Sequence, residues 1–305
     1  MELLRRTVGV VLPSSHVQVI IFGEHSPDWM AALAHDAPVW KRVAGTVVVS
    51  AFAETHDLPK TSRKDSRTVA IPLMEVHTRR CPRRYRSLIP DDRSIDVLSD
   101  KGAFATYVAA EGLSHLCPPT YPGPSDAGYP CVLKRLDLNG GVGVAVAQSR
   151  SDLDTFLEQA PWRDNPYILQ SLVSGSTEYV THCVCKEGRI LWHCTFACEL
   201  NSAGIVRDAS TTSTMSPSVA LPSTISAIEA LLAPLGYTGP CNVDYKLTEG
   251  GRIAVFEVNP RLGGSLMVPG HEEYLAGALS CIIRHAERRA GPADPRHELV
   301  RTRIS

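Results

Sequence analysis

Two apolar, alternating runs, Cys241 to Leu247 and Arg252 to Val258, flank a polar Glu-Gly-Gly turn and constrain the fold more than any other stretch. This pattern predicts a β-hairpin, with the two glycines forming a two-residue loop. Side chains alternate between the faces of a strand, so the pairing can be counted back from the turn. The count places Asp244 opposite Glu257 and aligns Asn259 on the same face.

The same count places Tyr245 opposite Phe256 on the other face of the hairpin. Two carboxylates that face each other on neighbouring strands repel, so something should neutralise them. A shared proton, a basic partner or a divalent cation would do so. Asn259 adds a neutral oxygen and Arg261 adds a cation suited to phosphate, and Mg²⁺ prefers such oxygen-rich sites. The alternative is a solvated hairpin with an accidental acidic pair.

Composition limits the class of protein. A chain of 305 residues with 44% hydrophobic content predicts a globular protein of one multi-lobed unit or two domains. The net charge of −1 gives no field that favours nucleic acid or membranes, and no apolar run approaches the roughly 20 residues of a membrane helix. Nine cysteines without a CxxC pair are typical of a reducing compartment, so we expect a cytoplasmic location.

The first 90 residues contain short β-branched runs, Val8 to Leu12, Val17 to Phe22, Thr46 to Phe52 and Val69 to Met74, with a weak helical stretch after the second. They predict a small α/β lobe. An arginine-rich cluster, His77 to Arg86, follows. It fits either an anion-binding surface or a solvated surface segment.

A helix capped by Ser99 or Asp100 is expected next, and Lys101 falls in its first turn, where a cation is unfavourable unless an anion lies nearby. Further on, Lys134 ends an apolar run before a loop that contains Gly140, Gly141 and Gly143. Backbone N–H groups of such a loop can contact phosphate oxygens, and Lys134 can reach the same phosphates. A plain flexible hairpin explains the loop as well.

A strand from Tyr167 to Val173 leads into a polar linker. Backbone and amide groups of such a linker commonly hold adenine, which is the role we expect for Gln170 and Leu172, with Glu178 at the ribose. A second hairpin, counted from a Glu-Gly turn at residues 187–188, places Glu178 and Glu199 on the same side.

In their order, these parts resemble the ATP-grasp superfamily over roughly residues 95 to 270, and in particular its carbamoyl phosphate synthetase-like and D-alanine:D-alanine ligase-like members. The matching positions are Asp100-Lys101, Lys134 with Asn139-Gly-Gly-Val-Gly143, Gln170 to Leu172 with Glu178, Asp244, and Glu257-Val-Asn-Pro-Arg261. Gln170 departs from the pattern, since many members have glutamate there. The segment from Glu199 to Ile205 also looks like the corresponding stretch of carbamoyl phosphate synthetase.

The resemblance implies a mixed α/β and α+β fold in which two lobes sandwich ATP. The expected parts are an N-terminal α/β lobe (1–95), a central lobe with the glycine-rich loop (96–170) and a C-terminal lobe with the metal-binding hairpin (171–305). It also implies a carboxylate–amine ligase, which activates a carboxylate as an acylphosphate, joins it to an amine and releases ADP and phosphate. A carboxylase, a small-molecule kinase and a non-catalytic nucleotide-binding regulator are the alternatives.

Roles follow from the same resemblance. We expect two Mg²⁺ ions, replaceable by Mn²⁺, to be held by Asp244, Glu257 and Asn259. The catalytic residues would be Arg261, Lys134 and Asn259. The nucleotide site would comprise Lys101, Lys134, Gly140, Gly141, Gly143, Gln170, Ser171, Leu172, Glu178 and Glu199. The expected partners are small carboxylates and amines, including amino acids, and a second copy of the chain in a homodimer, but no nucleic acid or membrane.

Overall fold

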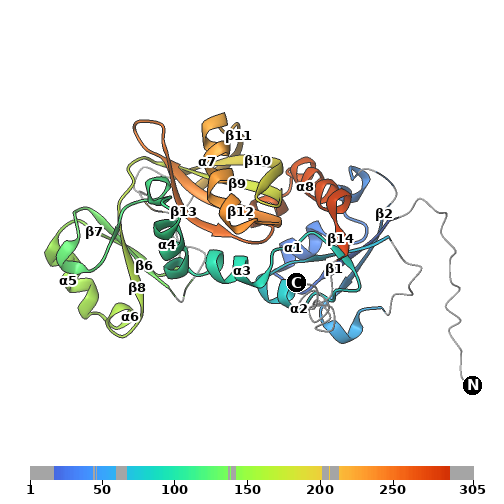
Figure 1. Ribbon diagram of the computed structural model, residues 1–305, viewed down its shortest axis with the longest axis horizontal. Coiled ribbons are helices and arrows are strands. Elements are labelled where there is room, and N and C mark those ends of the chain that lie inside the picture. The colour runs from blue at the N-terminus through green and yellow to red at the C-terminus, as the bar shows by residue number, and fades with distance from the viewer. Residues whose placement is uncertain are drawn as a thin grey trace, which may run out of the picture.

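The computed structural model describes residues 17–43, 45, 47–59, 67–136, 138, 142–200, 206 and 213–288. The strand expected at Val8 to Leu12 and the loop glycines Gly140 and Gly141 lie outside these residues. The described chain forms three sheets that follow one another along the long axis of the molecule (Figure 1). None of the helices in this part of the chain combines the length and the apolarity that a bilayer-crossing segment requires.

The first lobe is an α/β unit, as predicted. Its sheet has the order β14-β4-β3-β1-β2, formed by β1 (Val17–Phe22), β2 (Val47–Phe52), β3 (Thr68–Pro72), β4 (Arg86–Ser87) and β14 (Glu287–Arg288). Strands β1, β2, β3 and β4 pair in parallel and β14 is antiparallel. Its helical segments are α1 (Pro27–Ala32), α2 (Glu75–Arg80) and the short helices η1 (Pro38–Lys41) and η2 (Thr55–Asp57). The end of the chain thus completes the sheet of the first lobe.

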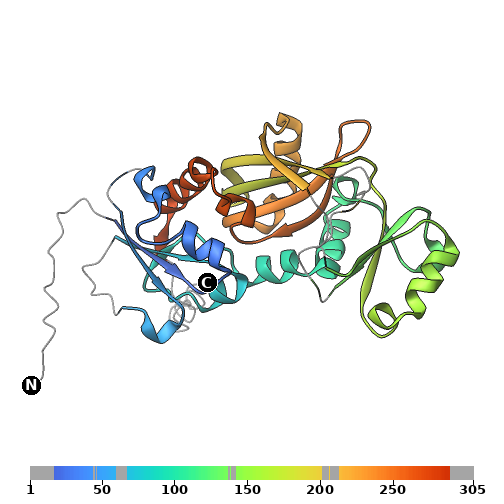
Figure 2. The ribbon, with the colours of Figure 1, turned by 180° about the vertical axis from the view of Figure 1, so that it is seen from behind.

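The second sheet is small and lies at the far end of the molecule from the first lobe (Figure 2). Its order is β5-β8-β6-β7, formed by β5 (Thr120–Tyr121), β6 (Cys131–Arg135), β7 (Val144–Ala147) and β8 (Tyr167–Ser171). Helices α5 (Arg150–Glu158) and α6 (Ala160–Arg163) pack on it around Leu153 and Trp162. The side chain of Ser149 caps α5 by accepting from the Asp152 N–H. Short helices η3 (Ser114–Leu116) and η4 (Pro124–Asp126) lead into this lobe.

The third sheet lies between the other two and is antiparallel. Its order is β11-β10-β9-β12-β13, formed by β9 (Thr177–Lys186), β10 (Arg189–Leu200), β11 (Ser213–Ser218), β12 (Gly239–Leu247) and β13 (Ile253–Asn259). The helices around it are α3 (Asp92–Ser99), α4 (Lys101–Ala110), α7 (Pro222–Leu232), α8 (Glu272–His285), η5 (Ala233–Leu235) and η6 (Gly264–Met267).

Each face of this sheet packs against its own core. On one face, side chains of α4 and α7 cover Tyr245 and Val258, and the Tyr107 hydroxyl donates to the Leu231 carbonyl at 2.6 Å. On the other face, α8 and the first lobe cover Val180 and neighbouring apolar residues. Because α4 packs on the third sheet, its first turn lies beside the hairpin of β12 and β13.

The arginine-rich cluster is partly structural. Arg79 forms ion pairs with Asp92 at 3.2 Å and with Asp96 at 2.5 Å, which link α2 to α3. The Arg86 guanidinium donates to the Ala286 carbonyl at 2.9 Å, next to strand β14. These contacts connect the first lobe to its neighbouring elements.

Candidate functional site

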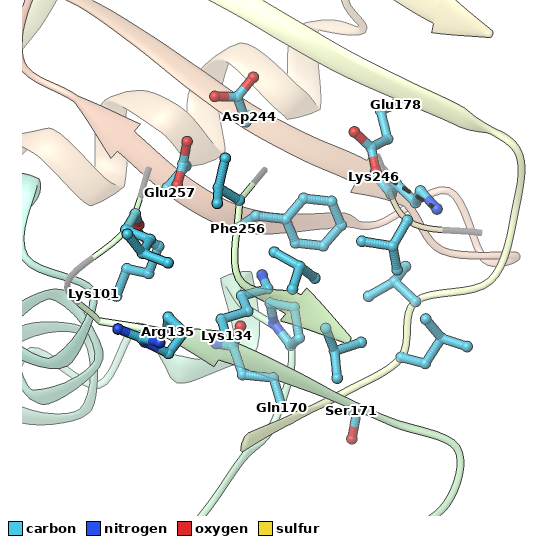
Figure 3. Close-up of a pocket in the computed structure, with 18 residues that line it drawn as sticks. Lys101, Lys134, Arg135, Gln170, Ser171, Glu178, Asp244, Lys246, Phe256 and Glu257 are labelled. Atoms are coloured by element: carbon cyan, nitrogen blue, oxygen red, sulfur yellow. Dashed lines mark hydrogen bonds and ion pairs between the residues drawn. The ribbon is translucent and has the colours of Figure 1, made fainter. Parts of the chain in front are cut away.

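A cleft between the second and third sheets contains most of the residues that the sequence singled out (Figure 3). One wall comes from β6 and β8 and the other from β9, β12 and β13. Its lining includes Lys101, Lys134, Gln170, Ser171, Leu172, Glu178, Asp244 and Glu257. These residues lie up to 156 positions apart between Lys101 and Glu257, and the fold brings them around one space.

The hairpin of β12 and β13 contains the acidic pair in the predicted register. Asp244 lies opposite Glu257. The turn, however, is one residue longer than expected, since Leu247 pairs with Ile253, and a β-bulge at Phe256 restores the count. The prediction that Tyr245 faces Phe256 was therefore wrong, because Tyr245 pairs with Val255.

The β-bulge at Phe256 determines which side chains of the hairpin line the cleft. An extra residue in one strand locally changes which side chains share a face. Val255 and Val258 pack into the core with Tyr245, whereas Phe256 and Glu257, although adjacent in sequence, both line the cleft. An aromatic ring and a carboxylate are thereby presented side by side.

Asn259 brings the polar groups of the hairpin together. Its amide nitrogen donates to Asn242 Oδ1 at 3.1 Å, to Asp244 Oδ2 at 3.3 Å and to Glu257 Oε1 at 3.2 Å. A half-turn of the amide would exchange its nitrogen for its oxygen and present a third oxygen beside the two carboxylates. The three residues therefore form a compact set of oxygen donors on half-buried side chains.

This donor set fits Mg²⁺. Within the described residues, no three His, Cys, Asp or Glu side chains are grouped so that they could hold a metal by themselves. Mg²⁺ does not require such a cage, because it commonly keeps waters and is bound by one or two carboxylates together with substrate phosphates. Asp244 and Glu257 supply the two carboxylates, and Asn259 supplies the neutral group.

Two lysines face the acidic pair from other elements. Asp100 caps α4 by accepting from the Ala103 N–H at 2.7 Å, so Lys101 occupies the first helical position, as predicted. Its ammonium donates to the Leu138 carbonyl at 2.7 Å, at the edge of the glycine-rich loop. Within that loop Gly143 has φ +70°, and a Cβ there would lie 2.7 Å from the Arg135 side chain, so the position requires glycine.

Lys134 lies at the centre of the cleft. Its ammonium is 4.7 Å from the centroid of the Phe256 ring, a cation–π contact between the two walls. Burial lowers the pKa of Lys134 to about 8, although the negative charges of Glu257 and Glu178 act in the opposite direction. An anionic ligand would therefore stabilise the charged form of this lysine.

The expected adenine segment lines the cleft, but its backbone donors are already engaged. The N–H groups of Ser171 and Leu172 donate to the carbonyls of Pro119 at 2.8 Å and Pro130 at 3.3 Å. The amide of Gln170 donates to the Thr120 hydroxyl at 3.3 Å. A base in this position would thus meet apolar side chains, backbone carbonyls and the remaining oxygen of Gln170.

Glu199 does not join the cleft residues. A second bulge, at Leu191, shifts the pairing of β9 and β10 so that Glu178 lies opposite Cys198 and Glu199 lies opposite Thr177. Opposed residues share a face and neighbours in a strand do not, so Glu178 and Glu199 point to opposite sides of the sheet. The Thr177 hydroxyl donates to the Glu199 carboxylate at 2.9 Å. The prediction that the two glutamates share a side was wrong.

Arg261 does not line this cleft but lies toward the first lobe. Its Nε is 3.2 Å from the Glu75 carboxylate at the start of α2, and its Nη1 donates to the Leu262 carbonyl at 3.1 Å. Strand β12 holds the loop that contains Arg261, because the Asn242 amide donates to the Arg261 carbonyl at 3.3 Å.

Buried His182 supports the same loop. Its Nε2 shares a hydrogen bond of 2.5 Å with the Ser265 hydroxyl, and the residue is 1% exposed. Burial, reinforced by the positive charges of His271 and Arg261, lowers the pKa of His182 to about 3. The imidazole is therefore neutral in the folded protein at neutral pH.

This burial predicts a dependence of stability on pH. The unfolded chain takes up a proton on His182 as the pH falls below about 6.5, whereas the folded chain does not until near 3. The contribution of neutral His182 to the free energy of unfolding is complete well above pH 6.5 and declines as the pH falls, by up to about 1.4 kcal/mol per pH unit. We expect the melting temperature of His182→Gln to fall less steeply than that of the wild type between pH 7.5 and 5. His193→Gln, at an exposed position on β10, should keep the wild-type slope, and a wild-type slope for His182→Gln would contradict the prediction.

Two cleft residues were missed in the sequence. Phe256 was assigned to the face of the hairpin opposite the acidic pair, because a bulge has no clear signature in an alternating pattern. Lys246 was not considered, although a signal existed. It lies two positions after Asp244 on the same strand, so the period of two places both side chains on the cleft side.

Comparison with known proteins identifies the fold of this chain. No protein-family model matches the chain. A stretch of 147 residues, 46% of the chain, is 29% identical to mitochondrial carbamoyl-phosphate synthase (ammonia) of Mus musculus, of which it covers 10%. The chain therefore spans about a tenth of the length of the first curated relatives it matches.

Solved structures match over most of the chain. D-alanine–D-alanine ligase from Bacillus anthracis, complexed with ATP, has a TM-score of 0.58 at 15% identity, covering 89% of this chain and 97% of that one. Phosphoribosylamine–glycine ligase from Thermotoga maritima has a TM-score of 0.59 at 15% identity, covering 90% and 77%. The resemblance noted in the sequence is thus confirmed, and the chain has the fold of the ATP-grasp superfamily.

Proposed function

We propose that this protein is an ATP-dependent ligase that activates a carboxylate as an acylphosphate and joins it to an amine. The observation that carries the proposal is the convergence of Asp244, Glu257 and Asn259 on one wall of a cleft whose other wall presents Lys134. Opposed carboxylates and a half-buried lysine are costly unless a ligand uses both. A metal-bound triphosphate has the charges that this arrangement complements. The structural neighbour that is complexed with ATP supports this choice of nucleotide.

The proposed roles follow the layout of the cleft. The base would lie along Gln170, Ser171 and Leu172, the ribose would approach Glu178, and the phosphates would extend toward the two lysines. Mg²⁺ would be held by the three residues of the hairpin; we propose two ions, which Mn²⁺ can replace. Bound Mg²⁺ would neutralise charge on the phosphate oxygens. Gly143 would shape the loop over the phosphates together with Gly140 and Gly141.

No nucleophilic side chain is required for this chemistry. A carboxylate oxygen of the substrate attacks the γ-phosphorus, and the bond to the β,γ-bridging oxygen breaks, so that ADP leaves with the electron pair. The amine nitrogen then attacks the acyl carbon, phosphate leaves, and the nitrogen loses a proton. Lys101 and Lys134 orient the phosphates and balance their charge, which lowers the barrier through positioning and electrostatics. Arg261, at the end of the same hairpin, would stabilise the acylphosphate.

A screen of ADP release tests the proposal. Carboxylates and amines, beginning with amino acids in pairs, are incubated with the protein, ATP and Mg²⁺, and the products are analysed by mass spectrometry. We expect ADP release that requires both substrates and a product whose mass is the sum of the two less one water. A product that gains phosphate identifies a kinase, and one that gains carbon dioxide identifies a carboxylase. Tight ATP binding without turnover in any mixture identifies a regulatory protein.

We further propose a cytoplasmic location and a homodimer. All nine cysteines are free thiols in the structure, and eight of them are buried, as expected in a reducing compartment. Light scattering after gel filtration would give the oligomeric state directly.

A further inference from the structure

Lys246 is a buried charged residue of the cleft that has no part in the roles given above. Lys246 is 1% exposed and is among the largest fully buried side chains of the described chain. It lies on β12, two residues after Asp244, and its side chain lines the cleft on the side of Glu178 (Figure 3). Lysine is almost never buried to this extent unless it is paired.

Lys246 links two separate segments to the metal-binding strand. Its ammonium donates to the Gly175 carbonyl at 2.7 Å, in the linker between the two lobes of the cleft. It also lies 4.0 Å from the Glu178 carboxylate, which is itself only 12% exposed. The pairing of β9 with β12 ends at Tyr179 and Tyr245, so Glu178 and Lys246 face each other one residue further along.

The linker is shaped for this contact. Gly175 has φ +107°, a conformation that L side chains rarely adopt, and its carbonyl is turned toward the lysine. A Cβ at this position would meet nothing within 4 Å, so the need for glycine is conformational and not steric. The turn, the lysine and the glutamate form one connected unit at the end of the cleft where the sugar would lie.

Stability alone does not account for a lysine here. Removing a charge pair from water is costly, and replacing a buried pair with apolar groups is often neutral or stabilising. The Lys246 side chain is only 2% exposed, so its ammonium has lost most of its contact with water. An apolar side chain would fill the same space without the free-energy cost of desolvating an ammonium group. The charge of Lys246 therefore indicates a role in nucleotide binding.

We infer that Lys246 is a positioning residue that holds the Glu178 carboxylate toward the sugar hydroxyls, so that the site selects ribonucleotides over deoxyribonucleotides. A carboxylate that is fixed in direction can accept hydrogen bonds from sugar hydroxyls through both of its oxygens. The ammonium of Lys246 supplies the neutralising charge and, through Gly175, a fixed anchor. This inference depends on the proposed function only in requiring that the cleft binds ATP.

Calorimetric titration of the full chain with ATP, 2′-deoxyATP and 3′-deoxyATP in Mg²⁺ tests the inference. We expect the affinity of the wild type for ATP to be at least about tenfold higher than its affinity for one or both deoxy analogues. The reason is that each analogue lacks a ribose hydroxyl that would donate to the charged Glu178 carboxylate. Lys246→Met should bring that ratio to within about twofold, and circular dichroism checks that the variant, which loses one member of a buried pair, remains folded at the temperature of the titration. Lys186→Met is the matched control, because Lys186 lies at the end of β9 on the same sheet as Lys246, and its ion pair is with Glu287 of β14 in the first lobe. It should keep the wild-type ratio.

A double-variant cycle separates positioning from a general charge effect. Glu178→Gln should also lower the ratio, and adding Lys246→Met to it should change the ratio no further. Equal losses of ATP and deoxyATP affinity in Lys246→Met, an unchanged ratio, or additive effects in the double variant would each overturn the inference. A wild type that binds ATP without discrimination would overturn this inference alone. A wild type that binds no ATP would overturn the proposed function and this inference together.

Discussion

Glu257→Gln is expected to lower the rate of ATP turnover by about a hundred- to a thousandfold while the protein remains folded. The substitution preserves the shape of the side chain but removes one of the two carboxylates that face each other on β12 and β13. Loss of one carboxylate leaves Asp244 without its like-charged neighbour, so the melting temperature should stay constant or rise slightly. Circular dichroism measures the melting temperature, and ADP release with the substrates found by the screen measures the rate.

Metal dependence gives a readout that needs no acceptor substrate. ATP affinity of the wild type should be higher in Mg²⁺ than in a chelator, and Glu257→Gln should lose most of that difference. Asp244→Asn should behave in the same way. Glu249→Gln is the control, since it makes the same change in charge at an exposed position in the turn of the same hairpin. Normal turnover by Glu257→Gln, or equal effects of both glutamate variants, would refute the metal assignment.

The sequence analysis paired Asp244 with Glu257 correctly, but only because two errors in the count cancelled each other. Counting from a two-residue turn gave the right partner for Asp244, although the turn is one residue longer and a bulge at Phe256 takes up the difference. In the other hairpin a bulge at Leu191 had no such compensation, and the face of Glu199 was misassigned. Local alternation determines strands well, but a bulge depends on the packing of both strands and leaves little trace in either one.

The elements themselves were more predictable than their contacts. The Asp100 cap, the strand that ends near Lys134 and the closing helix α8 each follow from short-range patterns of residues. The pairing of β14 with β4 joins segments 200 residues apart, and no local pattern encodes it. The same holds for the contact of Arg261 with Glu75, which depends on how the first lobe packs against the hairpin.

Lys134→Met should reduce ATP affinity by about tenfold to a hundredfold and, at the same time, leave stability unchanged or increased. The ammonium reaches from the second sheet to the Phe256 ring of the acidic hairpin, and its loss would remove a charge-assisted contact to phosphate. Methionine keeps the stem of the side chain and makes a favourable contact with the ring of Phe256, without the desolvation that burial imposes on the lysine. Calorimetric titration and thermal unfolding measure the two effects.

Substitutions of Lys134 and of Lys246 should then have different effects on nucleotide binding. Because Lys134 would contact phosphate, which ATP and deoxyATP share, Lys134→Met should weaken both nucleotides by the same factor and leave their ratio unchanged. AMP, which lacks the β- and γ-phosphates, should be affected far less than ATP. Lys246→Met should instead change the ratio of the sugars and act alike on AMP and ATP, because its effect would pass through Glu178 at the ribose. If Lys134→Met weakened AMP as strongly as ATP, the lysine would not lie at the phosphate end, and the orientation proposed for the nucleotide would have to be reversed.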